Sequence, residues 1–252
     1  MFTLNDKVAI VTGGNGGIGL GMARGLAKAG AHIAIFGRNP EKNASAVQEI
    51  QAHNVQATAH EVDVTSAESI EEAVADVVDR YGHLDILVNN AGMNISTRPE
   101  ALREEDWHTV MDTNVTSAFL CSKTCYPHLK KAGHGKILNC GSMYSIFGSH
   151  FSTAYGASKG AVVQLTRSLA TTWANDNIQV NCFLPGWIDT DLTAGGKKRM
   201  PELEGNVLNR TPAGRWGDPS DLEGIAVFLA SDASNFITGT AIPIDGGYSI
   251  NG

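Results

Sequence analysis

Residues 7–19 read KVAIVTGGNGGIG, and this stretch determines the fold. Lys7–Thr12 is a short β-rich apolar run that ends on glycines, as a buried strand does. A helix with apolar periodicity is predicted from about Ile18 to Ala29, closed by Gly30. Strand, glycine-rich turn and helix N-terminus together form an anion site, because glycines let a pyrophosphate approach the backbone and free N–H groups favour its charge.

The glycines of this loop follow a G-x-x-x-G-x-G spacing at Gly13, Gly17 and Gly19, instead of the commoner G-x-G-x-x-G. A glycine cluster alone indicates no more than a tight turn. Its position between a strand and a helix favours a phosphate-binding loop.

The second predicted strand, His32–Phe36, ends in Gly37-Arg38. A carboxylate about twenty residues past the glycine loop would bind the ribose 2′-hydroxyl of NAD, and none stands here. Gly37 leaves space, and Arg38 offers a planar cation suited to a 2′-phosphate. NADP(H) is therefore favoured and NAD(H) is possible; a solvated surface arginine is the alternative interpretation of Arg38.

Strands and helices alternate along the rest of the chain. Helices are expected over about 41–53, 66–80, 104–131, 153–174 and 219–230, and strands over about 57–62, 86–88, 136–140, 178–184 and 241–244. No long antiparallel pairs interrupt the alternation, which predicts an α/β protein with about seven parallel strands and helices on both faces. No linker or repeat divides the chain, so residues 1–252 are expected to form a single domain.

Two features depart from this regular pattern. Residues 191–217 mix glycine, proline and charge, and we expect an irregular, mobile substrate flap there. Asn114 lies inside the expected helix 104–131 although asparagine is a poor helix former, which indicates a local kink or a functional amide.

The chemistry is predicted by Ser142–Lys159, which reads SMYSIFGSHFSTAYGASK. Tyr155 and Lys159 are four residues apart, so on one helix their side chains share a face. A cation one turn away favours the ionised form of a phenol, which lets Tyr155 exchange a proton near neutral pH. Ser142, arriving from the preceding strand, would supply a second donor to the same substrate oxygen. The stretch predicts carbonyl/alcohol chemistry with a hydride carrier.

Composition excludes other classes of protein. The net charge of −7 without a basic patch makes nucleic acid an unexpected partner. No apolar run reaches the length of a membrane span, and no secretory signal is recognised, so we expect a cytoplasmic protein that does not bind membranes. The cysteines lack metal-ligand spacing, and we expect free buried thiols and no metal site; they are Cys121, Cys125, Cys140 and Cys182.

Taken in register, these motifs resemble the short-chain dehydrogenase/reductase family over essentially the whole chain. The resemblance rests on Thr12-Gly13-xxx-Gly17-Ile18-Gly19, Asn89-Asn90-Ala91-Gly92, Asn114, Ser142, Tyr155-xxx-Lys159 and Pro185-Gly186. It implies a Rossmann-like doubly wound sheet, a small-molecule carbonyl or alcohol substrate, and a homotetramer in which helices 104–131 and 153–174 pack across a dyad. The apolar character of the second helix agrees with a subunit interface.

The resemblance also implies roles for four catalytic residues. Tyr155 is the acid/base, and Ser142 polarises the carbonyl. Lys159 binds the nicotinamide ribose and supports Tyr155, while Asn114 holds a water that links Lys159 to solvent.

A larger set of residues is implied to bind the cofactor. It comprises Gly13, Asn15, Gly17, Ile18 and Gly19 in the glycine loop, Arg38, Asp63 and Val64 at the adenosine end, Asn90, Ala91, Gly92, Tyr155 and Lys159 at the ribose, and Pro185, Gly186, Ile188 and Thr190 at the nicotinamide. Asn15 stands where the NADP-preferring branch carries a second basic residue, so the NADP(H) preference depends on Arg38.

The C-terminal part, from Arg210 to Tyr248, resembles gluconate and 2-deoxygluconate dehydrogenases, and 3-oxoacyl-carrier-protein reductases share much of it. A partly apolar pocket for a small cyclic ketone or a sugar acid is expected from Met93, Asn94, Met143, Tyr144, His150, Phe151 and Trp187, each of which could equally be ordinary packing. One alternative is a 3-oxoacyl-carrier-protein reductase with docking cations at Lys197, Lys198 and Arg199. The other is a non-catalytic nucleotide-binding or scaffold protein, against which the intact catalytic set argues.

Overall fold

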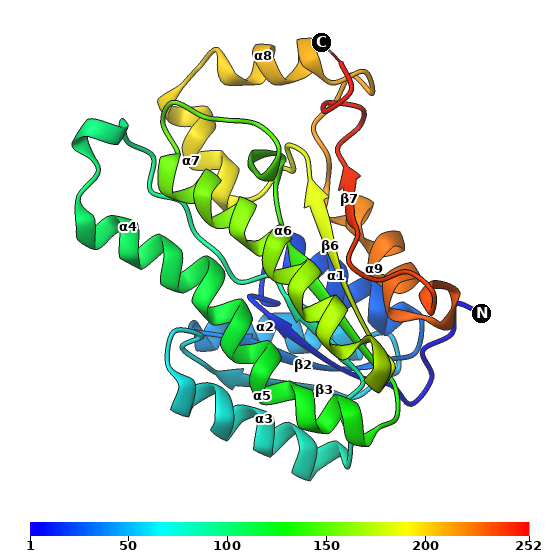
Figure 1. Cartoon of the computed structure of the whole chain (residues 1–252). Helices are drawn as coiled ribbons and strands as arrows, with labels where there is room; N and C mark the ends of the chain where they lie inside the picture. The colour runs from blue at the N-terminus through cyan, green and yellow to red at the C-terminus, as the bar shows by residue number, and fades with distance from the viewer. Residues whose placement is uncertain (252) are drawn as a thin grey trace.

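The chain builds one sheet of seven parallel strands in the order β3-β2-β1-β4-β5-β6-β7 (Figure 1). The computed structural model describes residues 1–251, except for the side chains of Lys198 and Arg199. The strands are β1 (Val8–Thr12), β2 (His32–Gly37), β3 (Ala57–Glu61), β4 (Ile86–Asn89), β5 (Gly135–Cys140), β6 (Ile178–Pro185) and β7 (Ala241–Ile244). The predicted number and direction of strands are confirmed.

Helices connect the strands. The α-helices are α1 (Gly17–Lys28), α2 (Pro40–Gln51), α3 (Ala67–Tyr81), α4 (Glu104–Met111), α5 (Ser117–Lys131), α6 (Thr153–Trp173), α7 (Asp191–Arg199), α8 (Leu203–Arg210) and α9 (Glu223–Ala230). The short helical turns are η1 (Pro99–Ala101), η2 (Asp112–Thr116), η3 (Met143–Ser145), η4 (Ala174–Asp176), η5 (Pro219–Leu222) and η6 (Asp232–Ser234). In the described part of the chain no helix is long and apolar enough to cross a membrane.

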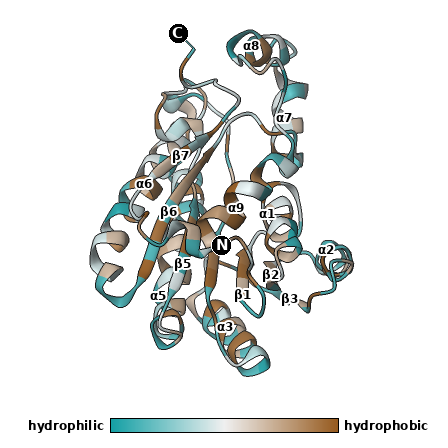
Figure 2. Cartoon of the chain, turned by 90° about the vertical axis from the view of Figure 1, so that its right-hand side faces the viewer, coloured by the Kyte–Doolittle hydropathy of each residue, from teal (hydrophilic) through white to brown (hydrophobic). Residues whose placement is uncertain are grey.

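Both faces of the sheet are buried. Along β1, Ala9 and Val11 pack with α1 and α9, whereas Val8 and Ile10 pack with α3, α5 and α6 on the opposite face. Figure 2 shows the central strands in brown, the colour of hydrophobic residues, with more hydrophilic helix surfaces around them. Burial on both sides explains why the strands read as continuous apolar runs without alternation.

The strand order reverses beside β1. The chain passes from β1 outward to β2 and β3, then returns to place β4 on the other side of β1. At such a reversal the loops that follow the two strands diverge and leave a crevice at their carboxyl ends, where open α/β sheets bind ligands. The glycine loop follows β1 and Asn89–Gly92 follows β4, so both lie at this crevice.

The expected helix 104–131 is divided by a wider turn. Residues Asp112–Thr116 form a π-helical turn between α4 and α5, and Asn114 lies in its middle. The kink predicted at Asn114 is therefore present, and its side chain is 2% exposed. Wide turns of this kind occur frequently at functional sites.

The expectation of irregular structure in residues 191–217 is wrong for residues 191–199 and 203–210, which are helical, whereas the substrate flap stays a prediction. The segment contains α7 and α8, which stand beyond one end of the sheet near the C-terminus (Figure 1). Thr190 and Thr193 cap α7 reciprocally, each side chain meeting the backbone of the other. The capping hydroxyls start a helix that the neighbouring glycines and charges obscure in the sequence.

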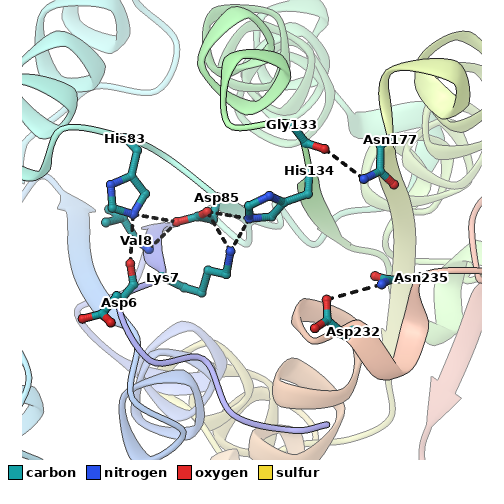
Figure 3. Close-up of polar contacts among 10 residues, drawn as sticks. All are labelled: Asp6, Lys7, Val8, His83, Asp85, Gly133, His134, Asn177, Asp232 and Asn235. Atoms are coloured by element: carbon teal, nitrogen blue, oxygen red, sulfur yellow. Dashed lines mark hydrogen bonds and ion pairs between the residues drawn. The ribbon is translucent and has the colours of Figure 1, made fainter.

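The amino ends of three central strands are held together by one buried carboxylate (Figure 3). The Asp85 side chain is 3% exposed and accepts the Val8 N–H at 2.8 Å. Lys7, His83 and His134 surround it, with nitrogen–oxygen distances of 3.3, 3.2 and 2.8 Å. These residues join the amino ends of β1, β4 and β5, so this polar cluster stabilises the sheet far from the crevice.

Helix α1 lies unusually close to its neighbours. A Cβ atom at Gly21 would lie 2.3 Å from the Pro219 carbonyl oxygen, and one at Gly25 would lie 2.7 Å from Glu223 Cα. Arg24 and Lys28 of the same helix pair with Glu223. These contacts hold α1, and with it the glycine loop, against η5 and α9.

We expect Gly21→Ala to lower the free energy of unfolding by about 1–3 kcal/mol, because the methyl group overpacks the contact with η5. Gly224→Ala is the matched control, since no atom lies within 4 Å of a Cβ at that helical position. The control should be neutral or stabilising by up to about 1 kcal/mol through helix propensity. Urea denaturation measures both; equal stability of the two variants would contradict the packing argument.

Candidate active site

The glycine loop meets the loop after β4 at close range. Gly13 and Gly17 have φ of +62° and +51°, and Ile18 packs on the core beneath the loop. A Cβ at Gly19 would lie 2.3 Å from the Gly13 carbonyl oxygen and 2.4 Å from Asn90 Nδ2. Only glycine fits there, so the helix N-terminus can open directly onto the crevice.

Thr12 joins these two loops, a role that the sequence did not reveal. Its hydroxyl oxygen accepts the N–H groups of Asn90 and Ala91, both at 3.0 Å. In return, Asn90 Nδ2 donates to the carbonyls of Thr12 and Gly13 at 3.1 and 3.2 Å. The predicted cofactor residues Asn90 and Ala91 are thus fixed to the glycine loop, and the only signal in the sequence is a hydroxyl on the last residue of β1.

The end of β2 has no room for a side chain at position 37. Asn15 Nδ2 donates to Asn43 Oδ1 at 2.7 Å, and Asn43 Nδ2 donates to the Gly37 carbonyl at 2.9 Å. A Cβ at Gly37 would lie 2.4 Å from Asn15 Nδ2 and 2.5 Å from Asn43 Oδ1. Position 37 carries no carboxylate, a larger residue there would have to displace the Asn15 and Asn43 side chains, and the exposed Arg38 follows it.

Asp63 stands near Arg38 at the end of β3. It accepts the backbone N–H and the hydroxyl of Thr65 at 2.9 and 2.7 Å. These hydrogen bonds hold the pKa of Asp63 below its usual value, and the positive charge of Arg38 acts in the same direction. Asp63 is ionised at neutral pH, while the adjacent Val64 packs on the core.

Lys159 is a buried cation beside Tyr155. Its side chain donates to the Cys140 carbonyl at 2.7 Å, and its Nζ lies 5.5 Å from the centre of the Tyr155 ring. Burial lowers the pKa of Lys159, but Cys140 and Tyr155, which are negative when ionised, outweigh burial and raise it. With 3% exposure, Lys159 is thus a charged group almost without water.

Ser142 is held by the first turn after β5. Its Oγ accepts the Tyr144 N–H at 3.2 Å and so keeps its own proton available as a donor. Ser145 completes the frame: it accepts the Ser142 N–H at 3.1 Å and donates to the Lys159 carbonyl at 2.8 Å. The Ser142 loop is therefore tied to helix α6, which carries Tyr155 and Lys159.

Asn114 is fully engaged by the protein. Its Oδ1 accepts the Met93 N–H at 2.8 Å, and its Nδ2 donates to the Met93 carbonyl at 3.0 Å and to Ser158 Oγ at 2.9 Å. A Cβ at Gly92 would lie 3.2 Å from Asn114 Oδ1 and 3.5 Å from Lys159 Nζ. The amide thus positions the loop after β4 and brings the π-helical turn next to Lys159.

The turn after β6 forms the opposite wall. Gly186, which follows Pro185 at the end of the strand, donates its N–H to the Ile244 carbonyl at 2.9 Å. Ile188 is 3% exposed, and the Thr190 methyl group would lie 3.3 Å from a Cβ at Gly17. The structure therefore places Thr190 across from the glycine loop, as binding of one cofactor by both requires.

Five aromatic rings form one connected cluster, here called the aromatic wall: Tyr144, Tyr155, Trp187, Trp216 and Tyr248. Tyr144 packs edge-to-face against Tyr155 at 6.0 Å and against Trp187 at 6.2 Å between ring centres. Trp187 in turn contacts Trp216 at 5.6 Å and Tyr248 at 6.5 Å. Burial raises the pKa of Tyr144, so its hydroxyl stays neutral. Trp216 and Tyr248 were not predicted, because they follow α8 and β7, far along the chain from the catalytic residues.

The other predicted pocket residues take different positions. Asn94 Nδ2 donates to Ser96 and Ser152, both at 3.1 Å. His150 is exposed and packs on Phe151, 4.6 Å between ring centres. Met143 is 4% exposed and packs in a buried cluster with Val162, Cys182 and Leu184, so it belongs to the core.

All four cysteines are buried and free, as predicted. Burial raises the pKa of Cys121 and of Cys182 to about 12, which makes both poor nucleophiles.

Known proteins resemble this chain over its whole length. A family model described as enoyl-(acyl carrier protein) reductase matches residues 13–249. Gluconate 5-dehydrogenase of Gluconobacter oxydans is 37% identical, covering 100% of this chain and 98% of its own. The 2-dehydro-3-deoxy-D-gluconate 5-dehydrogenase of Dickeya dadantii is 42% identical, and the match covers 98% of this chain and 97% of that protein. The crystal structure of a gluconate 5-dehydrogenase from Burkholderia cenocepacia, in complex with NADP and tartrate, matches with a TM-score of 0.94. The two sequences are 37% identical, and the match covers 99% of this chain and 97% of that one.

We expect Arg38→Gln to raise the KM for NADPH about tenfold and to leave the KM for NADH unchanged, because a charge-assisted contact worth about 1.5 kcal/mol is lost. Arg80→Gln removes an exposed arginine from α3 and serves as the control. Steady-state kinetics with both cofactors test the prediction. An equal effect of Arg38→Gln on NADPH and NADH would contradict a phosphate contact.

Proposed function

The chain belongs to the short-chain dehydrogenase/reductase family of NAD(P)-dependent oxidoreductases, and from that premise we propose that it interconverts a ketone and a secondary alcohol on a sugar acid, with NADP(H) preferred. The observation that carries the proposal is the buried Lys159 ammonium beside the Tyr155 ring, on a helix tied to the Ser142 loop.

In the reductive direction each of these side chains has a separate role. The bound cofactor supplies the hydride to the carbonyl carbon. Tyr155 gives a proton to the carbonyl oxygen, and Ser142 donates a hydrogen bond to the same oxygen. The charge of Lys159 stabilises the phenolate that remains on Tyr155. Asn114 fixes the wide turn next to Lys159. A water at that turn would pass a proton to Lys159, which would return it to Tyr155.

The cofactor is proposed to lie along the four strand ends. The glycine loop and the residues after β4 hold the pyrophosphate and the ribose, Asp63 and Val64 border the adenine, and the turn after β6 meets the nicotinamide. NADP(H) is favoured because Gly37 carries no carboxylate and because the exposed cation of Arg38 follows it. The related structure from Burkholderia cenocepacia contains NADP, which supports this preference.

A sugar-acid substrate is favoured over the cyclic ketone also considered from the sequence. The related enzymes of Gluconobacter oxydans and Dickeya dadantii both bear the names of sugar-acid dehydrogenases. The unpartnered donors Arg210 Nε and Trp216 Nε1 also suit an acidic, hydroxylated substrate.

The description of the matching family model keeps a carrier-protein substrate as an alternative. One of its expected docking cations is already engaged: Lys197 pairs with Asp189 at 3.1 Å and lies 4.0 Å over the Trp216 ring. The side chains of Lys198 and Arg199 lie outside the described residues.

We further propose that the chain is one domain and forms a cytoplasmic homotetramer through α4, α5 and α6. Phe119 on α5 is 44% exposed, and a large apolar side chain on the outer surface of a helix is suited to a subunit interface.

Tyr155→Phe should reduce turnover by about 10²–10⁴-fold, the usual contribution of a general acid/base, and should leave NADPH affinity unchanged within a factor of about two. Tyr81→Phe on α3 is the control, since its hydroxyl bonds only to Thr58 in the described chain. Nicotinamide absorbance reports turnover, and NADPH fluorescence reports binding. Retention of more than about a tenth of the activity would refute the role of Tyr155.

A further inference from the structure

Arg210, the last residue of α8, is held between two aromatic rings. Its Cζ lies 4.6 Å from the centre of the Phe147 ring and 4.4 Å from that of Tyr248. The two rings contact each other edge-to-face at 6.2 Å. A guanidinium attracted by both rings is fixed in orientation before any ligand arrives.

This guanidinium has no counter-ion in the described chain. No carboxylate of residues 1–251 lies within ion-pair distance, and its N–H groups donate to none of these residues. Nε is buried without an acceptor, whereas the two terminal nitrogens retain solvent contact. A buried donor without an acceptor costs about 1–3 kcal/mol, so an acceptor from outside the chain would relieve an existing penalty.

The neighbouring cations are already neutralised. Lys197 pairs with Asp189, and Arg215 makes two hydrogen bonds to Asp221 at 2.7 and 2.8 Å. Among the cations of 191–217 whose side chains are described, Arg210 is the one that forms no ion pair with a carboxylate of the described chain.

Arg210 belongs to the same aromatic wall as the proposed acid. From Tyr155 the wall continues through Tyr144 and Trp187 to Tyr248, in ring-to-ring steps of 6.0, 6.2 and 6.5 Å. Phe147 lies on the Ser142 loop, three residues beyond Tyr144. The guanidinium is therefore linked through this series of ring contacts to Tyr155.

Two donors of this aromatic wall have no acceptor. Five buried side-chain polar atoms lack a partner in the described chain, and two of them are Arg210 Nε and Trp216 Nε1. Both are donors, which matches a ligand that carries a carboxylate.

We propose that Arg210 binds the carboxylate of the substrate and thereby selects acids over neutral ketones, an inference that rests on the proposed function. Its two terminal N–H groups match the two oxygens of a carboxylate. Trp216 Nε1 supplies a further donor for a carboxylate or hydroxyl oxygen. A neutral ketone leaves the guanidinium without its acceptor, and a site built for a polar group discriminates strongly against a ligand that lacks it.

The test compares 5-keto-D-gluconate with its carboxamide, which has the same carbon chain without the charge. In Arg210→Gln, kcat/KM for the acid should fall about 10- to 150-fold, as expected for a lost hydrogen-bonded charge pair, and mainly through KM. In the same variant, kcat/KM for the carboxamide should change less than about threefold. Arg210→Lys should fall between wild type and Arg210→Gln, since lysine keeps the charge without the planar pair of donors.

Arg215→Gln is the matched control, because it removes a guanidinium that is already paired within the same segment. It should leave the ratio of acid to carboxamide activity unchanged. The inference is overturned if Arg210→Gln lowers the activities on the acid and on the carboxamide by the same factor, or lowers neither of them. A wild-type enzyme that reduces other ketones but neither of these two compounds instead contradicts the sugar-acid function itself. Should Arg210→Gln fail to fold, Arg210→Lys provides the same comparison.

Discussion

The buried charge of Lys159 is the interaction on which the proposed site depends. An ammonium with 3% exposure is costly unless it is hydrogen-bonded and has a partner that uses its charge. The Cys140 carbonyl satisfies one N–H, and the Tyr155 ring lies beside the group. A cation in such a dry position acts on a neighbouring phenol far more strongly than it would in water. The ordinary side chain of a tyrosine can then serve as an acid/base.

The fold supports this charge from several directions. The Ser142 loop is bonded to the Lys159 backbone through Ser145, and the π-helical turn brings Asn114 next to Gly92. Thr12 joins the glycine loop to the loop after β4, so the two loops proposed to hold the cofactor are bonded to each other. The Thr12 bonds join the carboxyl ends of the neighbouring strands β1 and β4. The polar cluster around Asp85 stabilises the amino ends of β1, β4 and β5 and takes no part in the site (Figure 3).

Local pattern was sufficient for the sheet, and it also suggested the proposed catalytic residues. Strand runs, the glycine loop and the spacing of Tyr155 and Lys159 are properties of short windows, and the odd residue Asn114 correctly indicated a kink. Residues 191–217 were misjudged because two capping hydroxyls outweigh the glycines that follow them. The Arg210 site was not predictable, since Phe147, Arg210 and Tyr248 meet only in the folded chain.

The most direct test of the account is the rate of hydride transfer in a single turnover of Lys159→Met, with NADPH and substrate both saturating. Removal of the ammonium should slow the step by about 10²-fold or more at neutral pH, since the phenol loses the charge that makes it an effective proton donor. Circular dichroism and NADPH fluorescence would verify that the variant is folded and loaded. A rate within about threefold of wild type under these conditions would show that the buried charge does not drive the chemistry.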